Sequence, residues 1–386
     1  MQTAVWLQLI PELIPELIPV SYLSNNGRKV GLINSELLPS AAKKIAMATR
    51  WGVIGAGLIS SDFVSAIRTL PESDHEVVAV ASRSTEVAAE FASKHSIPAH
   101  YGSYEDLLKD KEIDVVYIGT IHPTHLSIGL MALEAGKPVL CEKPMSLNAI
   151  QTSQLINKAR EKGLFLMEAT WMRFFPACVA LMDKVSRGEI GKVKFVRVNF
   201  SFRRPVEREK GRLVDPTLGG GSVLDVGVYA ISLATMLFGG SKPVKVHAEG
   251  TLLDTGVDDL AVITLTYPGG GIASLSCSIS YNFECEAHIG GTEGDLKLPH
   301  PFWCPTSLES PKGVYDFQKV SLEFPLPPLP HTNYPNSAGL RYEAEEVRSC
   351  LKRKAIESSI MPLDQSLVVA QVADEVMKQI GVIYTK

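Results

Sequence analysis

Short apolar runs alternate with helical patterns from Arg50 to Met167. The apolar runs are bounded by glycine or polar turns and are too short for helices, so each predicts a buried strand. Because strands that alternate with helices form parallel sheets, this half predicts an α/β Rossmann-type dinucleotide-binding domain over residues 47–168. The six predicted strands are 50–54, 76–81, 99–101, 113–118, 138–141 and 164–167.

The pattern changes after Glu168. Apolar and polar residues now alternate with a period of two, which indicates half-buried antiparallel strands. Two amphipathic helices, 337–353 and 363–380, close the chain. We therefore expect a C-terminal α+β domain, residues 169–386, with a largely antiparallel sheet that leaves one face open. Its predicted helices and strands before the closing helices are 171–185, 193–200, 222–238, 244–249, 259–266, 272–280, 285–290 and 295–298.

Composition and charge narrow the class of protein. Hydrophobic residues make up 45% of the chain and charged residues 21%, as in a soluble enzyme of about two domains. A net charge of -4 gives no reason to expect nucleic acid or an acidic membrane as partner. The six cysteines form no CxxC pair, so we expect reduced thiols and a cytoplasmic protein.

Residues 1–46 differ from the remainder. They contain a repeated Glu-Leu-Ile-Pro unit between Pro11 and Pro19, whose prolines break any signal-peptide helix. Met47 could begin a complete domain. We interpret 1–46 as a disordered leader or as the product of an upstream start.

A glycine-rich turn follows the first strand. It consists of Gly55, Ala56, Gly57, Leu58 and Ile59, and a helical pattern begins within it. Strand, glycine turn and helix form the dinucleotide fingerprint, in which the first glycine makes the tight turn and the second lets the backbone approach the pyrophosphate. Ser60, at the place of the third glycine, is small enough for close packing of the helix on the strand. These residues are predicted to bind the cofactor.

The second strand ends in Ser82, Arg83 and Ser84. An NAD site would have Asp or Glu here to accept hydrogen bonds from the ribose 2′-hydroxyl. Arg83 with two hydroxyls suits a 2′-phosphate instead, which favours NADP over NAD. The alternative is that Arg83 is an ordinary solvated cation.

The fourth strand leads into a loop with Thr120, His122 and His125. The two histidines could suggest a metal pair, but no third ligand is evident nearby, so no metal site is expected. We interpret the loop as a cover over the cofactor, with His125 in the first turn of the following helix.

Two further stretches of the sequence contain candidate catalytic residues. The strand 138–141 delivers Glu142 and Lys143 to the carboxyl edge of the parallel sheet, where ligands bind in such folds. Asp225 and Tyr229, four residues apart, share one face of an apolar helix that should be buried. A buried carboxylate needs a partner, and a lysine is a natural one. We therefore expect a site in the cleft between the domains.

These motifs together resemble the glucose–fructose oxidoreductase / inositol dehydrogenase (Gfo/Idh/MocA) family. The resemblance rests on the Gly55–Gly57 turn, the His125 loop, Glu142-Lys143-Pro144 and the segment from Gly221 to Tyr229, and it covers the chain from Met47 onward. Tyr229 replaces the commoner histidine. With Trp171, it makes the chain similar to those members that oxidise trans-dihydrodiols of aromatic hydrocarbons and D-xylose with NADP. The resemblance also implies a homodimer through the open sheet face.

The resemblance implies a mechanism in which a base removes the hydroxyl proton of a secondary alcohol while hydride leaves for the nicotinamide. Tyr229 would be the general acid/base, Lys143 would lower its pKa, and Asp225 would orient the pair. In a variant, Lys143 transfers the proton itself. Trp171, Phe200 and Phe202 are candidates for an aromatic wall that binds substrate, although core packing is an alternative for each.

Two other functions remain open from the sequence. The chain could act on a different sugar or on a biliverdin-like tetrapyrrole, or it could be a catalytically silent NADP-binding regulator. Because a regulator would have no need of Lys143, Asp225 and Tyr229 together, their joint presence favours an enzyme.

Overall fold

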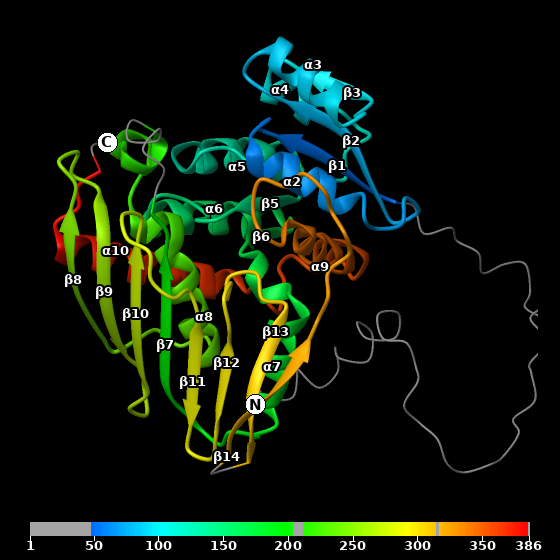
Figure 1. Cartoon of the computed structure of the whole chain (residues 1–386). Coiled ribbons are helices and arrows are strands. Elements are labelled where there is room, and N and C mark those ends of the chain that lie inside the picture. Colours follow the sequence, from blue (N-terminus) through cyan, green and yellow to red (C-terminus); the bar gives the residue numbers. More distant parts are fainter. Residues whose placement is uncertain (1–47, 204–210, 314–315, 385–386) are drawn as a thin grey trace, which may run out of the picture. The chain divides into compact units, whose positions relative to one another are not determined.

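A six-stranded parallel sheet organises the N-terminal half of the computed structural model, which describes residues 48–203, 211–313 and 316–384 (Figure 1). The strand order is β3-β2-β1-β4-β5-β6, the doubly wound order of dinucleotide-binding domains. The strands are β1 (Thr49–Ile54), β2 (His75–Ala81), β3 (Ala99–Tyr101), β4 (Val115–Ile118), β5 (Val139–Glu142) and β6 (Leu166–Ala169). The predicted Rossmann fold is confirmed, whereas the predicted leader, 1–46, lies outside the described residues.

Helices cover both faces of this sheet, because its strands are apolar on both sides. Along β1, Trp51 and Val53 face the core cluster that includes α2, while Ile54 belongs to the cluster on the opposite face. The helices are α2 (Leu58–Ile67), α3 (Thr85–Lys94), α4 (Tyr104–Leu108), α5 (His125–Glu134) and α6 (Ala149–Lys162). Gly163 ends α6 in the left-handed conformation, as its place after the helical pattern predicts.

The second sheet has eight strands in the order β14-β13-β12-β11-β7-β10-β9-β8. All its neighbours pair antiparallel except β7 and β10, so the largely antiparallel sheet is confirmed. The strands are β7 (Val193–Ser201), β8 (Lys245–Leu252), β9 (Asp258–Thr266), β10 (Ile272–Ser278), β11 (Ala287–Gly291), β12 (Asp295–Leu298), β13 (Ser307–Gly313) and β14 (Asp316–Glu323). The last two strands were not predicted, because β13 contains Pro311 and both strands carry charges that interrupt the apolar alternation.

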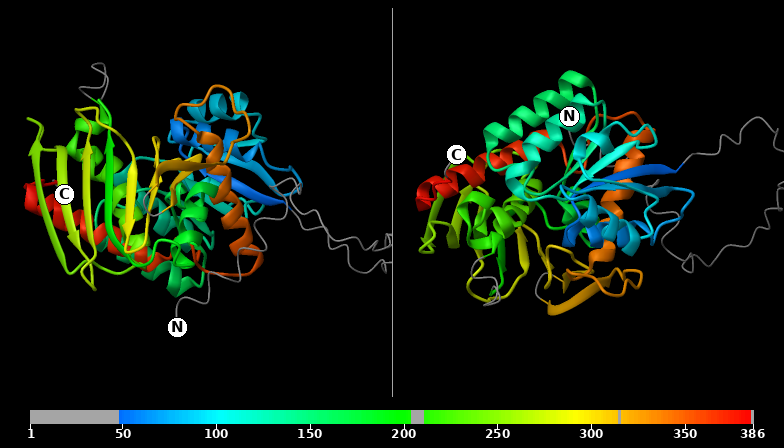
Figure 2. Two further views of the ribbon diagram at one scale, coloured as in Figure 1. Left: turned by 60° about the horizontal axis from the view of Figure 1, so that its bottom comes forward. Right: turned by 90° about the horizontal axis from the view of Figure 1, so that it is seen from above.

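Helices pack on one face of the second sheet, as Figure 2 shows. α8 (Val228–Leu237) contacts β7 and β10, and α10 (Leu363–Ile380) contacts β8 and β9. Alternate residues of the strands point away from these helices, among them the exposed Phe195, Val262 and Ile272. The remaining helices are α7 (Pro176–Ser186) and α9 (Leu340–Lys352), which follow the 3₁₀ turns Trp171–Phe174 and Ser337–Gly339.

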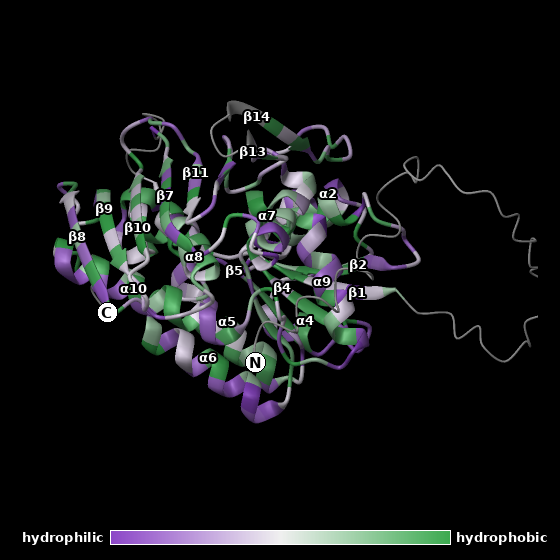
Figure 3. Ribbon diagram, turned by 90° about the horizontal axis from the view of Figure 1, so that it is seen from below, coloured by the Kyte–Doolittle hydropathy of each residue, from purple (hydrophilic) through white to green (hydrophobic). Residues whose placement is uncertain are grey.

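The helix that carries the second group of candidate residues begins irregularly. A π-helical turn, Val223–Gly227, precedes α8. The segment Pro216–Leu237 is long and apolar enough to cross a membrane by composition, but it is entirely buried within the protein. Figure 3 shows α8 as a hydrophobic helix among the sheet strands. It is therefore the core helix of the second domain, and the π turn before it contains Asp225; such turns are frequent at functional sites.

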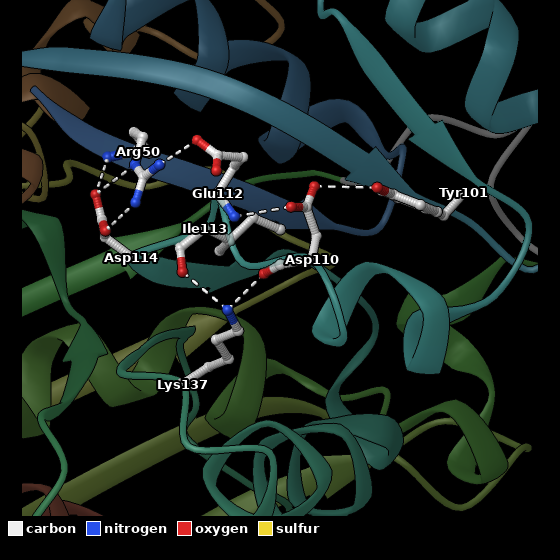
Figure 4. Close-up of polar contacts among 7 residues, drawn as sticks. All are labelled: Arg50, Tyr101, Asp110, Glu112, Ile113, Asp114 and Lys137. Atoms are coloured by element: carbon white, nitrogen blue, oxygen red, sulfur yellow. Dashed lines mark hydrogen bonds and ion pairs between the residues drawn. The ribbon is translucent and has the colours of Figure 1, made fainter.

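Charged residues also gather at the amino edge of the parallel sheet, opposite the predicted site (Figure 4). Arg50 at the start of β1 forms ion pairs with Asp114, at 2.9 Å, and with Glu112. Lys137 before β5 donates to the carbonyl oxygens of Asp110 and Ile113, at 2.6 and 2.9 Å. These contacts join the starts of neighbouring strands, so we interpret this edge as structural.

Candidate active site

Lys143 reaches the carboxyl edge of the parallel sheet because it follows β5 directly. Its Nζ donates a hydrogen bond to the backbone oxygen of Asp225, at 2.7 Å. The same atom lies 5.0 Å from the centroid of the Tyr229 ring. The structure thus brings together three residues, one from the Rossmann half and two from the helix of the second domain. Burial lowers the pKa of Lys143, while Asp225 and Glu142 oppose that effect.

Asp225 lies in the π turn, and its carboxylate faces a residue that was not predicted. The Arg212 guanidinium lies 2.8 Å from Asp225 Oδ1. Burial alone would raise the pKa of Asp225, but Arg212 and then Lys143 outweigh it and hold the pKa at about 2. The expectation that the carboxylate pairs with Lys143 is therefore wrong in detail: Arg212 takes the carboxylate, and Lys143 takes the backbone carbonyl.

Tyr229 is buried, and its hydroxyl oxygen accepts a hydrogen bond from Trp171 Nε1 at 2.8 Å. Burial and the Glu142 carboxylate raise the pKa of Tyr229 well above its usual value, although the Trp171 bond opposes them. The expected lowering of this pKa is thus wrong for this arrangement, because burial and then the Glu142 charge determine the direction of the shift. The phenol is neutral at physiological pH.

Aromatic rings line the neighbourhood of the Tyr229 hydroxyl. Phe200, at the end of β7, lies 5.6 Å from the Tyr229 ring between centroids and stacks on Trp303 at 4.1 Å. Trp303 was missed, although the aromatic pair Phe302-Trp303 in a loop between strands offers a signal. Trp171 and Phe200 are buried in the core, while Trp303 is half-buried. The third predicted wall residue, Phe202, is partly buried and packs both against the main core and against the small cluster with Leu213 and Val214.

The glycine turn fits a dinucleotide. Gly55 has φ +101, and a Cβ there would lie 2.9 Å from the Gly119 carbonyl oxygen, so only glycine fits. Gly57 has an ordinary φ of -93, and a Cβ on it would meet only that oxygen, at 3.8 Å. Protein packing thus does not require glycine at 57, which leaves the close approach of a ligand as the reason for it. Ser60 is fully buried beside Gly119, as predicted for a small third residue.

The predicted 2′-phosphate residues lie at the end of β2. Ser84 caps α3 by accepting from the Val87 N–H at 3.3 Å, and its hydroxyl donates to Glu86. Arg83 is exposed, while Ser82 is half-buried. The guanidinium is therefore accessible to a phosphate at this edge.

The loop that contains His122 and His125 contacts other loops of the site. Both ring nitrogens of His125 contact carbonyl oxygens, Nδ1 that of Pro144 at 2.9 Å and Nε2 that of Thr120 at 3.1 Å. His125 thus ties the Thr120 loop to the loop after Lys143. His122 Nδ1 lies 3.2 Å from the Gly219 oxygen. Burial and then Lys143 keep the pKa of His122 far below its usual value, so the ring is neutral.

The predicted Glu142 has a second buried carboxyl group, Glu343, as a neighbour, and this residue was not predicted. Glu142 accepts from the Tyr117 hydroxyl at 2.7 Å and from the Lys143 N–H at 3.2 Å. Glu343 in α9 is fully buried, and neither of its carboxylate oxygens has a hydrogen-bond partner among the described residues. Burial and repulsion from Glu142 raise the pKa of Glu343 well above its usual value. Because an ionised carboxylate without a donor is costly inside a protein, Glu343 carries a proton.

Replacing Glu343 with glutamine should raise the melting temperature at neutral and alkaline pH. The raised pKa means that the folded protein keeps a proton that the unfolded chain releases above the usual value of 4.5, so stability falls as the pH rises beyond it. Glutamine removes this penalty, whereas below that pH both forms are neutral and the difference should vanish. Thermal unfolding across pH tests this, with the exposed Glu72→Gln as control. A gain of equal size at acidic pH would contradict the protonation of Glu343.

Two family models match the chain. Residues 49–170 match the Gfo/Idh/MocA oxidoreductase family with an NAD-binding Rossmann fold. Residues 179–297 match the C-terminal domain of the same family. Together these models cover the parallel sheet and most of the second sheet, without β13 and β14, and they contain Lys143, Asp225 and Tyr229.

Relatives and solved structures agree with this match. Trans-1,2-dihydrobenzene-1,2-diol dehydrogenase from Danio rerio is 47% identical over 342 residues, which cover 88% of this chain and 99% of that protein. The Homo sapiens protein of the same name is 44% identical over 339 residues, covering 88% and 98%. A levoglucosan dehydrogenase bound to NADH and levoglucosan superposes with a TM-score of 0.77 at 20% identity, covering 87% of this chain and 97% of the other.

A 3-ketoreductase mutant from Actinomadura kijaniata, in complex with TDP-benzene and NADP, superposes with a TM-score of 0.71 at 23% identity, covering 86% and 98%. At such identities the two solved structures show the fold alone. The family models and the near full-length relatives carry the assignment further. The chain is an oxidoreductase with a nicotinamide-binding fold, and it belongs to the Gfo/Idh/MocA family.

Proposed function

We propose that this enzyme transfers hydride between NADP and a secondary alcohol, with trans-dihydrodiols of aromatic hydrocarbons and D-xylose as substrates. The observation that carries the proposal is the contact of Lys143 with Asp225 and the Tyr229 ring at the carboxyl edge of the parallel sheet. The aromatic side chains beside Tyr229 suit the flat face of a ring diol or a pyranose. The near full-length relatives named for a dihydrodiol support this substrate class.

In this mechanism Tyr229 exchanges a proton with the substrate oxygen. The nicotinamide, when bound, accepts or returns the hydride. Because the raised pKa keeps the phenol protonated, Tyr229 is ready to donate a proton to a carbonyl oxygen in the direction of reduction. Oxidation requires the phenolate, so its rate should rise with pH beyond neutrality. The Lys143 ammonium stabilises negative charge as it develops beside it.

Arg212 and Asp225 hold Lys143 in place. The Arg212 guanidinium fixes the Asp225 carboxylate, and the backbone oxygen of the same aspartate receives the ammonium group. Asp225 therefore orients the lysine through its main chain, and the ion pair with Arg212 holds that main chain at the site. Lys143 could also accept the substrate proton directly, and its lowered pKa favours this variant.

The preference for NADP rests on Arg83. We expect Arg83→Ala to weaken NADP binding by about 10- to 100-fold, the magnitude of a lost hydrogen bond to a charged group, while NAD binding changes little. Fluorescence titration of both nucleotides measures this. The exposed Arg68→Ala, at the end of α2, is the control. Equal losses for both nucleotides would show that Arg83 does not read the 2′-phosphate.

A substrate panel tests the proposed function. Purified enzyme is mixed with NADP and either a trans-dihydrodiol, D-xylose or other sugars, and the absorbance of reduced nicotinamide is followed. We expect turnover with the dihydrodiol and D-xylose. Turnover with a different sugar alone would show that this sugar, and not a dihydrodiol or D-xylose, is the substrate. Tight NADP binding without any turnover would favour a catalytically silent regulator.

We also propose a homodimer through the open sheet face and a cytoplasmic location. Phe195, Val262 and Ile272 are 44%, 49% and 41% exposed on that face, and a second copy would cover them. All six cysteines are free thiols and buried, as suits a reducing compartment. Light scattering of the purified protein tests the dimer.

A further inference from the structure

One connection of the second domain crosses α2, the helix that follows the glycine turn. Residues 324–339, here termed the strap, join β14 to α9, and Figure 1 shows them passing over α2. The strap contains the proline-rich run 325–330, which is stiff because each proline fixes its own backbone. Phe324, Leu326 and Leu329 of the strap pack against the hydrophobic core. The strap is thus an ordered part of the fold.

A single aspartate of α2 holds the middle of the strap. Asp62 is only 1% exposed and lies one helical turn after Leu58, at the end of the glycine turn. Its carboxylate accepts from the backbone N–H groups of Asn333 and Tyr334, each at 3.0 Å, and from Asn333 Nδ2 at 2.7 Å. The Ser337 hydroxyl also donates to it.

The same strap touches the turn expected to hold the pyrophosphate. Asn333 Nδ2 donates to the Leu58 oxygen at 3.2 Å. The helix N-terminus at Leu58 is where a dinucleotide phosphate would lie. The strap therefore crosses α2 beside the place predicted for the cofactor. Asp62, one helical turn after Leu58, anchors it there.

The next residue of the strap reaches the active site. The Arg212 guanidinium pairs with the Asp225 carboxylate, and its pKa is raised by Asp225 and further by Tyr334, whose side chain is thus its neighbour. Asp225 in turn holds Lys143 through its backbone oxygen. Asp62 is thus connected to the lysine through Tyr334, Arg212 and Asp225.

We propose that Asp62 is a positioning residue for the reaction: it anchors the strap over the dinucleotide turn and so holds Tyr334 against Arg212 in the active site. The proposal rests on the proposed function for the part of its role that concerns substrate. Its first consequence concerns the cofactor alone, since a released strap would uncover the turn at Leu58 and speed dissociation of the nucleotide. Its second consequence is a less firmly positioned Arg212–Asp225 ion pair and weaker binding of substrate.

The test uses Asp62→Ala and measures the dissociation rate of NADPH by stopped-flow fluorescence, together with kcat and KM. We expect dissociation to become about tenfold faster or more, and the KM for substrate to rise. Tyr334→Phe removes only the hydroxyl that meets Arg212 and leaves the backbone N–H to Asp62 intact. This variant should keep the wild-type NADPH dissociation rate and raise only the KM for substrate.

Asp74→Ala is the matched control. Asp74 also ties the Rossmann half to a later segment, through a contact of 2.6 Å with Arg348 of α9, but it lies outside the strap. Its loss should lower the melting temperature without changing NADPH dissociation. If Asp62→Ala does not fold, Asn333→Ala takes its place, because it removes the amide that donates to both Asp62 and Leu58.

Unchanged NADPH dissociation in a folded Asp62→Ala or Asn333→Ala protein would overturn the proposal. So would an equal acceleration in Asp74→Ala, which would indicate general loosening. Because NADPH dissociation is measured without substrate, this outcome is separate from the proposed function. Wild-type protein that binds NADPH but turns over no diol or sugar would refute only the proposed function.

Discussion

Replacing Lys143 with methionine is expected to lower kcat for diol oxidation by about 10²- to 10⁴-fold, the range that acid–base groups contribute. Methionine preserves the length of the chain but removes the ammonium group that lies beside the Tyr229 ring and donates to the Asp225 oxygen. Lys143 is required whether it stabilises charge or accepts the proton itself, so this effect should be the largest of any single change. Steady-state kinetics with NADP measure it.

Lys137→Met is the matched control for this variant. Lys137 precedes β5 and Lys143 follows it, so the two lysines lie at opposite ends of the same strand. Lys137 donates to two carbonyl oxygens at the amino edge, and its loss should reduce stability without affecting kcat. Retained turnover in Lys143→Met, with the protein folded and NADP bound, would remove the lysine from the chemistry.

Replacing Tyr229 with phenylalanine should reduce kcat by about 10²-fold or more while NADP binding is retained. Phenylalanine keeps the ring that packs near Phe200 and beneath Lys143, and it loses only the hydroxyl that Trp171 contacts. The variant therefore isolates the proton that the hydroxyl carries. The wild-type enzyme should also oxidise faster as the pH rises, because burial raises the pKa of Tyr229, and this dependence should disappear in the variant.

Tyr267→Phe serves as control for the tyrosine. Tyr267 is a buried tyrosine of the second domain that stacks on Phe238 at 4.2 Å, away from Lys143. Its hydroxyl should have no effect on turnover. If Tyr229→Phe instead keeps nearly wild-type turnover, Lys143 accepts the proton directly, as its lowered pKa would allow.

The sequence predicts the fold well where local patterns are strong. The apolar strands of the Rossmann half, the glycine at 55 and the capping glycine at 163 follow from rules that act within a few residues. The strands β13 and β14 were missed because β13 contains Pro311 and both strands carry charges, so their pairing depends on the neighbouring sheet.

Within the site, the sequence predicts which residues meet but not how they face one another. Lys143, Asp225 and Tyr229 converge as expected, yet Lys143 points at a backbone oxygen and a ring face. That orientation depends on the π turn, which no residue pattern in the sequence predicts. Arg212 and Glu343 come from distant segments of the chain, and an arginine in a loop or a glutamate in an amphipathic helix is ordinarily exposed.

The most direct test of the account mixes the enzyme rapidly with NADP and a trans-dihydrodiol and follows the appearance of reduced nicotinamide within the first turnover. Reduced nicotinamide should form rapidly in the wild-type enzyme. Its formation should be slowed by about 10²-fold or more in both Lys143→Met and Tyr229→Phe, although both bind NADP. Formation at the wild-type rate in both variants would contradict the proposed roles of Lys143 and Tyr229.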